Sequence, residues 1–62
     1  AASALLTTTM PEQRRLAALG YLRSQPDEQT VALLREYLAW EAKPELRRRA
    51  RRLLRRVERS LA

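Results

Sequence analysis

The chain has no cysteine, no histidine and no phenylalanine, and its 62 residues include one glycine, one tryptophan and one methionine. Without cysteine it can form neither a disulfide framework nor a reactive thiolate. Without histidine it lacks the commonest metal ligand and the commonest general base. Leucine and alanine supply most of the apolar side chains, which favours helices over sheets. We therefore expect an all-α protein with no metal site and no cofactor.

Long apolar runs are also missing. No stretch approaches the roughly 18 apolar residues of a transmembrane helix, and Ala1–Leu6 is too short for the apolar part of a signal peptide. The absence of cysteine is compatible with a reducing compartment, so we predict a cytoplasmic location. Because the chain begins with alanine rather than methionine, we expect a fragment or a processed product of a longer protein.

Positive charge is concentrated in the last third of the chain. The segment Pro44–Ala62 holds eight arginines and two glutamates, so its formal charge of +6 equals that of the whole chain. The first 43 residues therefore sum to zero. Any argument from charge to a binding partner must concern this last segment.

Three similar start signals divide the chain, each with a proline followed by an acidic residue. They are Thr9–Glu12, which also has the spacing of a capping box, Ser24–Asp27 and Ala42–Glu45. The chain is therefore predicted to form one domain over residues 10–62, preceded by a frayed segment at 1–9. Its helices are expected at Met10–Ser24, Pro26–Glu41 and Pro44–Ser60, with consecutive helices antiparallel because their connections are short.

The apolar spacing predicts which side chains face the core. In the first helix we expect Leu16, Leu19 and Leu22 to point inward, and Gln13, Arg14, Arg15 and Arg23 to point outward. Gly20 would allow a neighbouring helix to approach closely. The middle helix presents a wide apolar arc: Val31, Leu33, Leu34, Tyr37, Leu38 and Trp40. We expect Tyr21, Tyr37 and Trp40 to serve core and helix-end packing, with their polar tips reaching water.

The last helix has the clearest pattern. Its apolar side chains recur at spacings of three and four and line one face: Leu46, Ala50, Leu53, Leu54, Val57 and Leu61. The remaining positions are nearly all arginine, including Arg47, and are expected to face outward. Glu45 is expected to pair with Arg49, and Glu58 with Arg55.

Parts of the chain resemble a known family. The segment Pro44–Arg47, with the apolar residues that follow it to Val57, is similar to the second helix of a HEAT-like repeat, and Ala18–Leu22 resembles the end of that helix in the preceding repeat. Leu19 and Leu54 would then be equivalent positions 35 residues apart, which suits a two-helix solenoid unit. The resemblance covers about one and a half repeats, from Pro11 to Val57. It implies a HEAT-like fragment or a small three-helix bundle that acts as a protein-binding scaffold.

The outward arginines are the candidate site. We predict that an anionic partner binds five of them: Arg48, Arg51, Arg52, Arg55 and Arg59. Guanidinium groups pair with carboxylate and with phosphate, so the partner could be an acidic protein surface, the rest of a longer parent chain, or nucleic acid bound through its backbone. A purely solvated helix face is a further alternative. The apolar face has no tryptophan or phenylalanine and is needed for the core, which argues against a membrane-surface partner.

No combination of residues indicates catalysis. The sequence contains no nucleophile–base pair, phosphate-binding loop or paired carboxylates at ligand spacing. We therefore predict that the chain is not an enzyme. The expected function is a non-catalytic interaction module of helical-repeat type, with non-specific nucleic-acid binding through the arginine face as the alternative.

Overall fold

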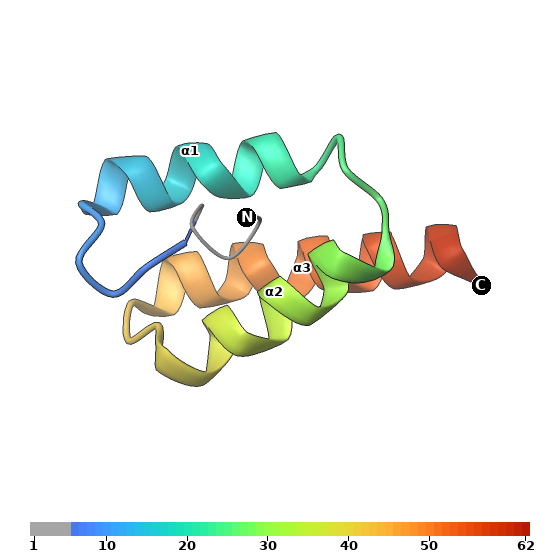
Figure 1. The fold of residues 1–62 in the computed structure, drawn as a ribbon. Helices are drawn as coiled ribbons and strands as arrows, with labels where there is room; N and C mark the ends of the chain where they lie inside the picture. Colours follow the sequence, from blue (N-terminus) through green and yellow to red (C-terminus); the bar gives the residue numbers. More distant parts are fainter. Residues whose placement is uncertain (1–5) are drawn as a thin grey trace.

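A computed structural model describes residues 6–62, which form three α-helices and no strand. The helices are α1 (Glu12–Leu22), α2 (Glu28–Trp40) and α3 (Pro44–Leu61). Consecutive helices run antiparallel, so α1 and α3 run in the same general direction (Figure 1). The all-α prediction is confirmed. The frayed segment predicted at 1–9 falls partly outside the described residues, since 1–5 are not among them.

The helix α3 is the common packing partner of α1 and α2. A single cluster of buried apolar side chains joins the three helices: Leu6, Leu19, Leu22, Leu33, Leu34, Tyr37, Leu46, Ala50, Leu53 and Val57. Four of them come from α3, at the spacing of three and four that the sequence predicted. Leu6 is also buried, although it belongs to the segment expected to be frayed.

The helices α2 and α3 begin in different ways. Pro44 is the first residue of α3, as expected, because its missing N–H has no partner to lose there. Asp27 caps α2, and its carboxylate accepts the Thr30 N–H at 2.8 Å. The helix α2 therefore begins two residues after the predicted Pro26.

The predicted capping box at Thr9 and Glu12 is wrong. The cap position of α1 is Pro11, and no side chain caps it. Thr9 instead lies in a turn in which the Met10 N–H donates to the Thr7 carbonyl oxygen at 3.2 Å. The Glu12 carboxylate is bound by the Lys43 ammonium group. As a result α1 begins at Glu12 rather than Met10.

Three predictions for α1 side chains are also wrong. Arg15 points inward, with 16% of its side-chain surface exposed, whereas Leu16 is 40% exposed. The inward positions are Arg15, Ala18, Leu19 and Leu22, a helical stripe that starts with the arginine. Gly20 has no close neighbour, since a Cβ added there would meet nothing within 4 Å.

The aromatic side chains depart from expectation at two positions. Tyr37 is fully buried, and its hydroxyl donates to the Glu41 carboxylate at 2.7 Å instead of reaching water. Tyr21 is 54% exposed and takes no part in the core. Trp40 is partly buried and meets Tyr37 edge to face, with ring centroids 4.8 Å apart. Leu61, which was expected to face inward, is 45% exposed near the end of α3.

None of the helices in residues 6–62 combines the length and the apolar character needed to cross a membrane.

Candidate functional site

The arginine surface of α3 lies away from the buried stripe of that helix. All five arginines predicted to bind an anionic partner are exposed: Arg48, Arg51, Arg52, Arg55 and Arg59. Their exposure follows from helical periodicity, because burying one stripe of α3 against α1 and α2 turns the other positions toward solvent. Arg47 is the exception among the arginines of α3, since it is only partly exposed. Its Nη1 donates to the carbonyl oxygens of Leu38 and Glu41, so it caps the end of α2.

Acidic side chains neutralise little of this surface. Glu45 and Arg49 approach to 3.9 Å, and both are more than half exposed. Glu58 was expected to pair with Arg55, but it accepts from Arg35 of α2 at 2.6 Å instead. Within residues 6–62, no carboxylate lies at ion-pairing distance from Arg23, Arg52, Arg55, Arg56 or Arg59. The positive charge on this side is therefore largely uncompensated.

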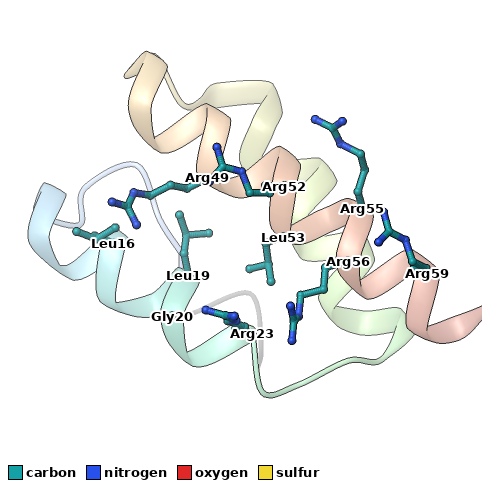
Figure 2. Close-up of a pocket in the computed structure, with 10 residues that line it drawn as sticks. All are labelled: Leu16, Leu19, Gly20, Arg23, Arg49, Arg52, Leu53, Arg55, Arg56 and Arg59. Carbon is teal, nitrogen blue, oxygen red and sulfur yellow. The ribbon is translucent and has the colours of Figure 1, made fainter.

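The structure places part of this surface along a groove between α1 and α3. Three residues of α1 line it, Leu16, Leu19 and Gly20, together with Arg23 directly after that helix. Six residues of α3 line it as well: Arg49, Arg52, Leu53, Arg55, Arg56 and Arg59. Leu19 and Leu53 face each other across the groove, and Arg49 extends from α3 toward Leu16 (Figure 2). The groove, with a volume of about 740 Å³, thus has an apolar floor and arginine walls.

Only some of the predicted site residues line the groove. Arg52, Arg55 and Arg59 line it, whereas Arg48 and Arg51 lie on the exposed surface beyond it. The sequence did not single out Arg49, Arg56 or Arg23 as site residues. Arg49 and Arg56 continue the stripe of Arg52 and Arg59 at spacings of three and four, so periodicity alone could have found them. Arg23 directly follows α1, and only the packing of α1 on α3 brings it to the site.

A buried polar network fixes α1 to the end of α2, beside the start of α3. The Arg15 Nε donates to Glu41 Oε1 at 2.7 Å, and its Nη1 donates to the Met10 carbonyl oxygen at 2.7 Å. Glu41 also accepts the Tyr37 hydroxyl at 2.7 Å and the Lys43 N–H at 3.0 Å. No buried side-chain polar atom in the described part of the chain lacks a partner. This network orients the helix that supplies one wall of the groove.

The network also changes two pKa values. Burial by itself would raise the pKa of Glu41, but the hydrogen bonds from Tyr37, Lys43 and Arg15, together with the charge of Arg15, hold it below its ordinary value. Burial raises the pKa of the Tyr37 hydroxyl, and its hydrogen bond to Glu41 and the charge of that carboxylate raise it further. At neutral pH the network therefore contains a carboxylate, a guanidinium and a neutral phenol.

The residues that line the groove suit anionic ligands better than cationic ones. Its lining side chains are leucines, one glycine and arginines, so they present many N–H donors and neither an acceptor nor a nucleophile. Guanidinium forks suit carboxylate or phosphate oxygens, while Leu16 offers exposed apolar surface beside them. No group of three or more acidic residues in the described chain is arranged to hold a metal ion.

Comparison with family models, with curated proteins and with solved structures finds no match to this chain. The geometry and the charge of the groove are therefore what a functional assignment has to explain.

Proposed function

We propose that the chain is a non-catalytic interaction module whose arginine surface binds an acidic segment of a partner protein. The observation that carries this proposal is the gathering of six arginines, five from α3 and Arg23 directly after α1, along a groove with an apolar floor. Like charges held this close repel one another, and within the described residues only Glu45 lies near one of them. An anionic partner would relieve that repulsion.

The apolar floor favours an acidic protein over nucleic acid. A phosphodiester backbone could pair with the arginines, but it has no apolar group to cover Leu16. The groove also has no aromatic side chain on which bases could stack, and no asparagine or glutamine to read their edges. An acidic polypeptide can supply both carboxylates and apolar side chains.

One observation still favours nucleic acid as a second candidate. Arg48, Arg51 and Arg55 form an exposed stripe along about 10 Å of α3. Of these three only Arg55 also lines the groove, so such a row could follow a phosphate backbone that lies largely outside it. Binding of that kind would be independent of sequence, and six phosphate contacts would give a log–log salt slope of roughly −5.

We further propose that the fold is a HEAT-like repeat fragment, in line with the sequence resemblance. The parallel course of α1 and α3 supports this, because the resemblance makes them equivalent helices of successive repeats (Figure 1). Leu22 and Val57, which the 35-residue offset equates, are 2% and 1% exposed. A cytoplasmic location stays a prediction from the sequence.

The proposal can be tested with two labelled polyanions of similar charge. A peptide of glutamate and leucine and a short duplex DNA are titrated with the protein at low and at near-physiological salt, and fluorescence anisotropy is recorded. We expect the peptide to bind at near-physiological salt, and its binding to weaken at least about tenfold when Arg52, Arg55 and Arg59 are changed to glutamine.

Two results would overturn the protein-binding function. One is tighter binding of DNA than of the peptide at near-physiological salt, with a steep salt dependence that the Arg48→Gln, Arg51→Gln variant removes. The other is the absence of peptide binding even at low salt, because the uncompensated charge would then have no acidic protein ligand.

A further inference from the structure

The α1 side of the groove has an open space next to an exposed apolar side chain. Gly20 lines the groove, and a Cβ added to it would meet no atom within 4 Å. Leu16 precedes Gly20 by one helical turn on the same side of α1 and is 40% exposed. A side chain from outside could therefore enter over Gly20 and cover Leu16.

The α3 side presents a regular row of cations. Arg49, Arg52, Arg56 and Arg59 follow spacings of three, four and three, so they form a stripe along the groove that extends about 15 Å from end to end. Leu53 lies beside this row and points into the groove (Figure 2). Arg23 provides a cation at the opposite wall, from the end of α1.

We propose that the groove between α1 and α3 binds an acidic amphipathic helix. One apolar side chain of this helix enters the space over Gly20 against Leu16, and carboxylates one turn apart pair with the arginines of the walls. This assignment depends on the interaction function proposed for the chain, and it adds the location and the conformation of the bound partner.

The geometry favours a helix over an extended segment. Side chains three and four residues apart on a helix are about 5–6 Å apart, and the arginine row on α3 has the same spacing. A helix also satisfies its own backbone hydrogen bonds. An extended segment would bring backbone N–H groups against lining side chains that donate hydrogen bonds but cannot accept them. The length of the row matches about three turns of a partner helix.

The test uses two synthetic peptides of about 14 residues made of glutamate, leucine and alanine. In the first, the leucines recur at spacings of three and four and form one face of a helix. The second is a scrambled version with the same composition and charge but no apolar face. Binding to the intact chain is measured by isothermal titration calorimetry at near-physiological salt, and the helicity of each peptide is checked by circular dichroism.

Two substitutions probe the groove itself. Leu16→Gln removes the exposed apolar contact, and Leu61→Gln is its matched control, since Leu61 is similarly exposed at 45% but does not line the groove. Gly20→Leu fills the open space. Because leucine forms helix better than glycine, this variant should unfold at a higher urea concentration than the native chain while binding the peptide less well.

We expect the amphipathic peptide to bind about tenfold more tightly than the scrambled one. Leu16→Gln and Gly20→Leu should each weaken its binding about fivefold or more, with Leu61→Gln unchanged. Equal affinities for the two peptides, or full binding by Gly20→Leu, would overturn the helix-binding groove. The interaction function would survive that result if the peptide of glutamate and leucine still bound, and it would fail if no acidic peptide bound.

Discussion

Replacing Glu41 with glutamine tests whether the buried network holds the three helices together. Glu41 accepts four hydrogen bonds: from Arg15 Nε and Nη2 at 2.7 and 3.4 Å, from the Tyr37 hydroxyl at 2.7 Å and from the Lys43 N–H at 3.0 Å. A glutamine amide has one acceptor oxygen, and its other atom is an N–H₂ donor. At least one of these donors must then face another donor in the core.

The expected loss of stability follows from the burial of the ion pair between Arg15 and Glu41. Removing one partner of a buried ion pair costs about 3–5 kcal/mol. Glu41 has 4% of its side-chain surface exposed, but Arg15 has 16% and can be partly hydrated, so we expect the lower end of that range, about 3 kcal/mol. A chain of 62 residues has a total free energy of unfolding of about 3–9 kcal/mol. The substitution should therefore remove a third or more of the stability.

Urea unfolding followed by far-ultraviolet circular dichroism measures this effect. With a slope of about 1 kcal/mol per molar urea, the midpoint of Glu41→Gln should fall by roughly 3 M. Glu58→Gln is the matched control, because it makes the same chemical change in a pair whose side chains are 65% and 40% exposed. Such a surface pair contributes at most about 1 kcal/mol. If Glu41→Gln leaves no folded state, Tyr37→Phe removes a single hydrogen bond of the network, at about 1–2 kcal/mol.

Equal midpoints for Glu41→Gln and Glu58→Gln would refute the reasoning. They would mean that the pair between α1 and the end of α2 contributes no more than a solvated surface pair.

Three further predictions concern helix ends, the groove and pH. Asp27→Ala removes the acceptor of the Thr30 N–H and should lower the free energy of unfolding by about 1 kcal/mol; an unchanged urea midpoint would contradict the capping role. Gly20→Ala should raise the free energy of unfolding by about 1 kcal/mol, because alanine favours helix and the added Cβ meets no side chain or neighbouring helix within 4 Å. A lower thermal midpoint for this variant would contradict the open space at Gly20. The pKa of Glu41 is lowered on folding, so its stabilisation is complete above the unfolded value of about 4.3 and is lost as pH falls below that value through the folded one. The difference in urea midpoint between the native chain and Glu41→Gln should therefore be full at neutral pH and shrink in acid, and a difference that grew in acid would contradict this sign.

The helix α3 could be predicted from its sequence almost to the residue. Pro44 marks its start, and its buried stripe recurs at spacings of three and four over many turns, so local periodicity is sufficient. The exposure of the five predicted arginines follows from the same periodicity. The prediction was wrong at Arg47, which caps α2, and at Glu58, which pairs with Arg35, because another helix intervenes there. It was also wrong at Leu61, which is exposed near the end of α3.

The helix α1 was harder to predict because two neighbouring residues compete for its inner face. Arg15 and Leu16 differ by about 100° around the helix, and the leucine is the more apolar of the two. Arg15 nevertheless points inward, because Glu41 lies there to pair with it, 26 residues further along the chain. Turning α1 in this way leaves Leu16 exposed beside Gly20 and Arg23.

The sequence by itself determined that this protein is helical, where α3 begins, and that its positive charge lies on one side of α3. These properties depend on composition and on side chains within a few residues of one another. Only the tertiary structure decided that α1 rotates to bury Arg15, and that Arg23 joins the arginines of α3 around an apolar floor. Both depend on hydrogen bonds and packing between helices, and no local spacing in the chain specifies them.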